Sequence, residues 1–153
     1  MRRFVNPGNT AFEVAVNSQI YVDKTGLLAY TNSVINTKQA LICSSRPRRF
    51  GKSITADMLC AYYSRGCDSD SIFASYEIAK SDYYKKHLNQ YDVIYLDIQW
   101  CMMDAGSAEQ TVSYLNYHVI EELKEIYPQI LPDGIRTAYG AMSCINAQTG
   151  VKF

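Results

Sequence analysis

A Gly-Lys-Ser triplet follows a short apolar run in this chain, and this order constrains the fold more than any other feature. The run QALICSS covers residues 39–45, and the triplet is Gly51, Lys52 and Ser53. Beyond the triplet, apolar side chains recur at helical spacing from Ile54 onward. We therefore expect a strand, a loop and a helix in succession, which is the setting of a phosphate-binding loop.

The loop departs from the usual pattern at its entrance. The phosphate-binding pattern is G-x-x-x-x-G-K-[ST], and Arg46 stands where its first glycine belongs. Pro47 follows and has no N–H to offer a phosphate. In such a loop, backbone N–H groups surround the phosphates, the lysine (here Lys52) neutralises them, and the hydroxyl (here Ser53) binds Mg²⁺. The sequence thus predicts a variant of the nucleotide-binding loop.

Two other interpretations of the same loop remain open. It could be a basic surface turn whose glycine eases entry into the helix, or a hook in which Arg46, Arg48 and Arg49 contact nucleic-acid phosphates. The 15 basic and 15 acidic residues of the chain cancel, so any site for nucleic acid must be local. No wider basic stripe or aromatic platform accompanies the three arginines.

The remaining pattern predicts an α/β fold, with a parallel sheet flanked by helices. Ser107 and Gln110 form a capping box that starts the clearest helix. The predicted elements are a helix from about Lys24, short helical turns within 67–91, a strand over 92–100, and helices over 107–127 and about 135–148. Two strands are few for a covered sheet, and TGVKF begins another apolar stretch, so we expect the fold to continue beyond Phe153.

Cysteine usage and hydropathy predict a cytoplasmic protein with no membrane partner. The five cysteines are odd in number and scattered, and they include no C-x-x-C pair, which favours reduced thiols. No segment approaches the roughly 20 apolar residues of a membrane span. The first residues also lack the apolar stretch of a secretory signal.

Three segments together resemble the AAA-ATPase-like family of bacterial proteins. They are IYVDKTGLLAYT at 20–31, RPRRFGKS at 46–53 and DVIYLDIQ at 92–99. An arginine in place of the first glycine is the usual form of this family's loop. The resemblance implies a P-loop domain that binds ATP and Mg²⁺, commonly followed by a C-terminal domain related to PD-(D/E)XK nucleases. Residues 1–153 would be the N-terminal part of the P-loop domain, with 1–38 as a lid-like segment and 39–153 as the start of the α/β core.

The resemblance also implies which residues bind the nucleotide. The implied nucleotide ligands are Tyr21, Arg46, Arg48, Arg49, Phe50, Gly51, Lys52, Ser53 and Ile54. Ser53 would also bind Mg²⁺.

The upstream YVDKT box has two interpretations. In related ATPases a short helical segment at this place covers the adenine, so Tyr21, Val22 and Lys24 could form a lid. By physical chemistry alone, Asp23 followed by Lys24 and Thr25 could equally start a helix, because an acidic residue favours the helix N-terminus.

Asp97 is a candidate for the carboxylate that holds Mg²⁺ during hydrolysis, because it follows four apolar residues in VIYLD. No second acid follows, since Ile98 and Gln99 come next. In the family the paired acids come after a segment resembling AQTGVKF, so we expect them beyond Phe153 and expect Asp97 to end a neighbouring core strand. The chain would then bind nucleotide, with hydrolysis only in the complete protein. The alternative is a non-hydrolysing nucleotide switch that regulates an attached nuclease-like domain.

Overall fold

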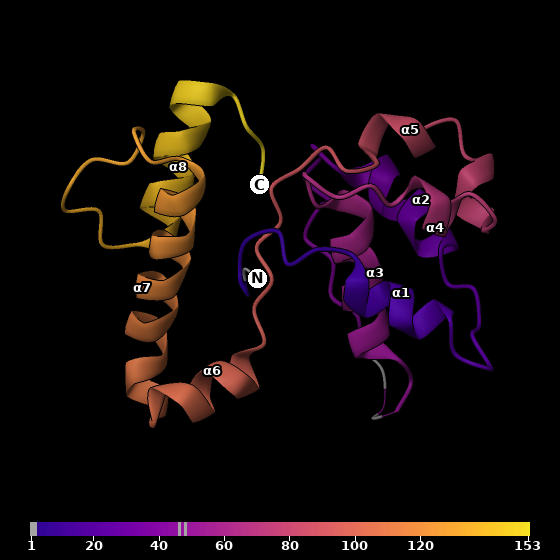
Figure 1. The fold of residues 1–153 in the computed structure, drawn as a ribbon, viewed down its shortest axis with the longest axis horizontal. Helices are drawn as coiled ribbons and strands as arrows, with labels where there is room; N and C mark the ends of the chain where they lie inside the picture. Colours follow the sequence, from indigo (N-terminus) through magenta and orange to yellow (C-terminus); the bar gives the residue numbers. More distant parts are fainter. Residues whose placement is uncertain (1–2, 46, 48) are drawn as a thin grey trace. The chain divides into compact units, whose positions relative to one another are not determined.

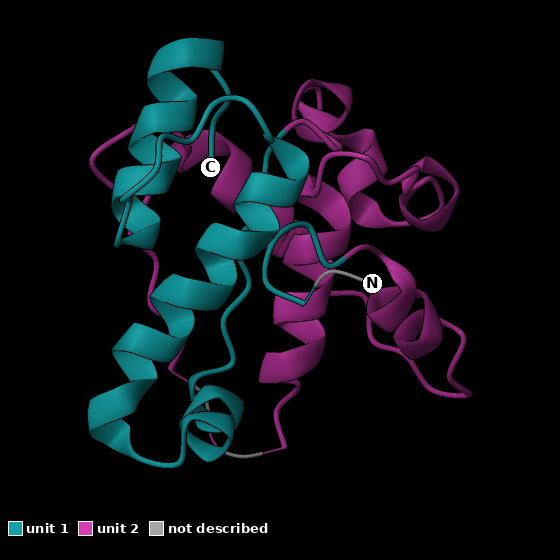
Figure 2. Ribbon diagram, turned by 60° about the vertical axis from the view of Figure 1, so that its left-hand side comes forward, with its two compact units in different colours: residues 1–7, 91–153 teal, residues 8–90 magenta. Residues whose placement is uncertain are grey.

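The computed structural model describes residues 3–45, 47 and 49–153 (Figure 1). These residues form eight α-helices and one 3-10 helix. The chain divides into two compact units, Met1–Pro7 with Tyr91–Phe153 as unit 1 and Gly8–Gln90 as unit 2 (Figure 2). No helix in the described part of the chain combines the length and the apolar character that crossing a bilayer requires.

The predicted parallel α/β sheet of P-loop type is wrong for this structure. The described residues contain no β-strand, and Val5 and Ile94 form an isolated antiparallel bridge. Residues 39–45 form no strand and are exposed along their whole length, with Leu41 at 95%. A strand is stabilised by neighbours that pair its N–H and C=O groups, and a short apolar run does not reveal whether such neighbours exist.

Unit 2 surrounds an aromatic core. Its elements are α1 (Thr10–Val16), α2 (Gly26–Val34), α3 (Lys52–Tyr63), α4 (Asp70–Phe73), η1 (Glu77–Lys80) and α5 (Tyr84–His87). The three short elements confirm the helical turns predicted within 67–91. Helix α1 packs on α3, and both α2 and α5 contact η1. The largest buried side chains of this core are Phe12, Leu28, Met58, Tyr62, Phe73 and Ile78.

Tyr62 on α3 links most of these elements. Its ring is fully buried and packs edge-on against Phe73, with 5.4 Å between the ring centroids. Its hydroxyl donates to the Tyr84 carbonyl at 2.8 Å and accepts from the Asn32 side-chain amide at 2.9 Å. Because a buried polar group is costly without partners, these bonds fix the C-terminal half of α3 in the core.

Unit 1 is built on one long helix. Its elements are α6 (Ile98–Ala105), α7 (Ala108–Ile126) and α8 (Ala138–Thr149), and both α6 and α8 pack against α7 (Figure 1). The predicted helices over 107–127 and 135–148 are confirmed, and Ser107 caps α7 by accepting from the Gln110 N–H at 3.3 Å. The strand predicted over 92–100 is wrong, because residues 92–97 form no strand and residues 98–100 form the start of α6.

A single carboxylate attaches the N-terminal segment to α7. The two oxygens of Glu122 accept the backbone N–H groups of Arg3, Phe4 and Val5, at 2.8, 2.9 and 2.7 Å. Three successive donors on one carboxylate satisfy amides that have no helix or strand to pair with. The segment lies in the core of unit 1, where Phe4 and Val5 are buried.

Glu122→Gln should lower the free energy of unfolding of unit 1. The amide keeps one acceptor oxygen and turns an NH₂ donor toward backbone donors, so we expect a loss of about 1.5–3 kcal/mol in urea titrations followed by circular dichroism. Glu121→Gln is the matched control, because Glu121 pairs with the exposed Lys124 at 2.8 Å and should contribute about 0.5 kcal/mol or less. Equal losses in the two variants would contradict the role given to Glu122.

Candidate functional site

Helix α3 begins directly after Gly51, as the Gly-Lys-Ser triplet predicts. Gly51 is the N-cap and adopts the left-handed conformation, with φ 74° and ψ 30°, which glycine reaches without steric cost. Its carbonyl accepts the N–H of Thr55 at 2.9 Å. Because glycine has no side chain, none caps the first turn of α3. Helices α1 and α2 also lack a side-chain cap, whereas a side-chain oxygen accepts a first-turn N–H in α6, α7 and α8.

The loop ahead of α3 contains a second left-handed residue, Arg49, with φ 68°. Among the described residues, every other position with positive φ is a glycine or an asparagine. Those two residue types enter the left-handed region readily, whereas a long side chain pays about 1–2 kcal/mol. Backbone strain of this kind persists where the surroundings enforce it and is frequent at functional sites.

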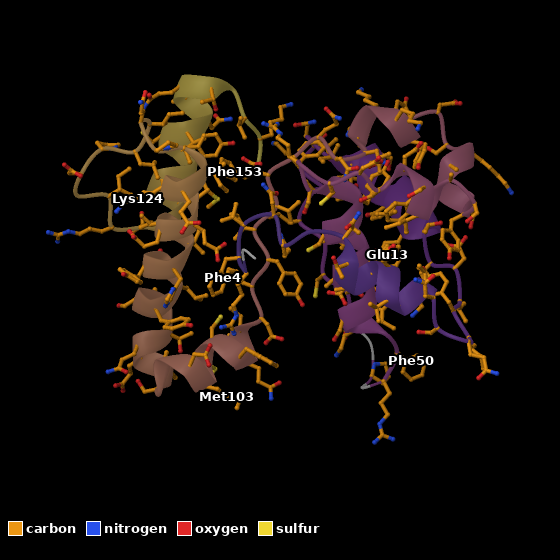
Figure 3. The ribbon with its side chains drawn as sticks, in the orientation of Figure 1. Phe4, Glu13, Phe50, Met103, Lys124 and Phe153 are labelled. Atoms are coloured by element: carbon orange, nitrogen blue, oxygen red, sulfur yellow. The ribbon has the colours of Figure 1, made fainter. Side chains whose placement is uncertain are left out.

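Most of the candidate ligands that the structure describes have exposed side chains. The side chains of Lys52, Ser53 and Ile54 are exposed at the start of α3. Phe50, labelled in Figure 3, is 61% exposed. Residues 49–54 contain no carboxylate. Of the predicted ligands in this loop, Arg46 and Arg48 lie outside the described residues.

The upstream box and the loop meet in the folded chain. The Lys24 ammonium donates to the Phe50 carbonyl at 3.0 Å, although the two residues are 26 positions apart. A Cβ atom added to Gly51 would lie 2.6 Å from the Lys24 Nζ atom, so the glycine leaves the space that the ammonium occupies. The sequence placed Lys24 either in a lid or at a helix start, and neither interpretation predicted its contact with the loop.

Asp23 and Thr25 anchor the box to η1. The Asp23 carboxylate accepts the N–H of Thr25 at 2.7 Å and that of Glu77 at 3.0 Å, and the fully buried Thr25 hydroxyl accepts from the Ile78 N–H at 3.2 Å. Partial burial pushes the pKa of Asp23 upward, but the two N–H donors, the Thr25 hydroxyl and the charge of Lys80 together hold this pKa below its ordinary value. Helix α2 begins immediately afterwards at Gly26, in agreement with the helix-start interpretation.

Tyr21 packs on the core of unit 2. Its ring meets Phe12 and Tyr76 edge-on, with centroids 5.9 and 5.5 Å apart. Burial, and after it the charge of Asp23, raises the pKa of Tyr21 to about 12. These contacts explain why a tyrosine is accommodated here, and contact between Tyr21 and an adenine remains a prediction.

Asp97 belongs to unit 1 and caps a helix. It is the N-cap of α6, where its carboxylate accepts the Trp100 N–H at 3.1 Å. The expectation that Asp97 ends a core strand is therefore wrong. It also lines a small cavity of about 40 Å³ together with Arg3, Phe4, Tyr95 and Cys101. Ligand pockets for small molecules are typically about 300 Å³ or larger, so this cavity cannot hold a nucleotide.

Comparison with known proteins links both parts of the candidate site to one family. A family model described as a predicted AAA-ATPase matches residues 8–145, a range that includes the upstream box and the loop. No curated protein and no solved structure matches the chain.

Arg49→Asn should leave the free energy of unfolding unchanged or raise it by up to about 1 kcal/mol, because asparagine adopts the left-handed conformation at lower cost. Thermal and urea unfolding would measure the change. The control is Arg136→Asn, an exposed arginine without positive φ, which should have no effect. A clear loss of stability confined to Arg49→Asn would mean that its side chain, rather than its backbone, determines the loop conformation.

The contribution of Asp23 to stability should depend on pH. Because its folded-state pKa lies below the unfolded value of about 3.9, the carboxylate stabilises the fold fully above that value, and the contribution disappears as pH falls through the folded pKa. Wild type should therefore be more stable than Asp23→Asn near neutral pH, and the difference should shrink in acid. Urea titrations across this range would test it, and a pH-independent difference would contradict it.

Proposed function

Because the chain belongs to the AAA-ATPase-like family, we propose that it binds ATP with Mg²⁺ through the loop that opens α3. The observation that carries this proposal is the start of α3, where Gly51 in the left-handed conformation leaves the first turn without a side-chain cap. Lys52 and Ser53 follow it with exposed side chains.

The available donors match the chemistry of a polyphosphate. The first-turn N–H groups of a helix have no intrahelical partner and carry about half a positive charge, which favours an anion. Lys52 adds an ammonium and Arg49 a guanidinium, which can form paired hydrogen bonds with phosphate oxygens. No carboxylate within residues 49–54 opposes the anion. This charge balance favours a phosphate ligand over a cationic one.

Magnesium would enter with the nucleotide. Mg²⁺ prefers hard oxygen ligands, retains several waters and commonly binds through the phosphates plus one or two protein oxygens. The exposed hydroxyl of Ser53 is such an oxygen, one residue into the helix after Lys52. The bound ion would neutralise charge on the phosphates, while Lys52 and the first-turn amides of α3 orient them.

We propose binding for this chain and reserve efficient hydrolysis for the complete protein. Hydrolysis requires a metal-binding acid and a group that orients water, and Asp97, the candidate acid, is engaged as a helix cap. The alternative in the same family context is a nucleotide switch without turnover that regulates an attached nuclease-like domain. Multiple-turnover phosphate release by the full-length protein would exclude the switch.

We also propose that the protein works in the reducing cytoplasm. Its five cysteines all carry free thiols, and Cys60 and Cys101 are buried. Burial, followed by the charge of Asp57, raises the pKa of the Cys60 thiol to about 12, so this thiol stays protonated and unreactive at neutral pH.

Lys52→Ala should weaken the affinity for Mg-ATP by about tenfold or more, because a charge-assisted contact to phosphate is lost. Isothermal titration calorimetry on residues 1–153 would measure it. The matched control is Lys38→Ala, an exposed lysine of the same unit outside the loop, which should bind like wild type.

Ser53→Ala tests the proposed metal contact separately from the phosphate contacts. It should weaken ATP binding when Mg²⁺ is present and leave binding in EDTA unchanged, because only the metal contact is lost.

Equal ATP affinity in wild type and Lys52→Ala would overturn the proposed function. Salt-sensitive DNA binding that depends on Arg48 and Arg49 but not on Lys52 would favour the nucleic-acid hook instead.

A further inference from the structure

We propose that Lys24 is a positioning residue of the nucleotide-binding loop, which orients the Gly51 N–H by holding the Phe50 carbonyl. This inference rests on the proposed function and adds a residue outside the Gly-Lys-Ser triplet. It starts from the 3.0 Å hydrogen bond between the Lys24 Nζ atom and the Phe50 oxygen.

The planarity of the peptide group transmits this contact to the neighbouring amide. The Phe50 C=O and the Gly51 N–H belong to one trans peptide, so they point in opposite directions. An ammonium that fixes the carbonyl on its own side therefore fixes the N–H on the other side. Without this bond, the permissive backbone of Gly51 could let the peptide turn and present a carbonyl oxygen, which repels phosphate. Lys24 thus selects the orientation that offers a donor.

Gly51 is suited to this contact for a second reason besides its backbone conformation. A Cβ atom at this position would come within 2.6 Å of the Lys24 Nζ atom. The lysine end is flexible, so a side chain at position 51 would push the ammonium off the Phe50 carbonyl. The glycine of the triplet therefore serves both the turn into α3 and the approach of Lys24.

The neighbours of Lys24 hold its backbone in place. Asp23 and Thr25, on either side, are hydrogen-bonded to the backbone N–H groups of Glu77 and Ile78 at the start of η1. Lys24 itself is exposed and forms no ion pair with any carboxylate among the described residues. Its charge therefore adds to that of Arg49 and Lys52 in the loop. The upstream box therefore holds the Lys24 backbone in place, and the Lys24 ammonium extends to the loop.

The test compares Lys24→Gln and Lys24→Arg in the chain of residues 1–153. Lys24→Gln should weaken Mg-ATP and Mg-ADP binding by about tenfold, because a charge-assisted hydrogen bond is lost. Lys24→Arg keeps the positive charge and should retain most of the wild-type affinity. Adenosine binding should not change between the variants, because it has no phosphate for the Gly51 N–H to contact. Lys38→Gln is the charge-matched control and should bind like wild type, and thermal unfolding should show all variants equally folded.

A double-mutant cycle with Gly51→Ala adds a readout that a general structural role would not move. If Lys24 acts through the Phe50–Gly51 peptide, Lys24→Gln should have little further effect on ATP affinity in the Gly51→Ala background. Fully additive losses would overturn the inference, as would wild-type affinity in Lys24→Gln while Lys52→Ala still fails to bind. No ATP binding by wild type would overturn the proposed function and, with it, the role of Lys24.

Discussion

Unit 2 depends on the buried side chain of Tyr62, through the hydrogen bonds of its hydroxyl and the packing of its ring. Through this residue α3 is bonded to the Asn32 side chain on α2 and to the backbone of Tyr84 in α5, and it packs on Phe73 in α4. A helix held this firmly at one end can present its other end to solvent without losing its position. The segment from Arg49 to Ser53, which we propose to bind nucleotide, therefore adjoins a helix whose far end is fixed in the core.

The two ends of α3 differ in what they contribute: one end packs in the core, and the other is the proposed binding end. The C-terminal half supplies Met58, Ala61 and Tyr62 to the core, whereas the first turn is exposed and has no side-chain cap. The loop before it includes a left-handed arginine, a conformation that costs free energy rather than supplying it. A protein that used this segment only as a connection would gain from relieving that strain. The well-packed core of unit 2 offsets it.

The helices could be predicted from the sequence because their signals are local. Apolar spacing and the Ser107 cap define α7, and the Gly-Lys-Ser triplet marks the start of α3. The strands could not, because residues 39–45 and 92–100 carry apolar side chains whose burial depends on distant partners. Asp97 followed an apolar run in the expected way but caps a helix. The contact between Lys24 and Phe50 could not be predicted either, because it joins residues 26 positions apart.

The hydrogen bonds between the Glu122 carboxylate and the N–H groups of residues 3–5 join this segment to a helix more than a hundred residues later in the sequence. Unit 1 is therefore discontinuous in sequence, whereas unit 2 is one continuous segment, Gly8–Gln90. During synthesis on the ribosome, unit 2 can fold as soon as its own segment has emerged, because domains generally fold as units in order of synthesis. Residues 3–5 can form their hydrogen bonds to Glu122 only after α7 has left the exit tunnel.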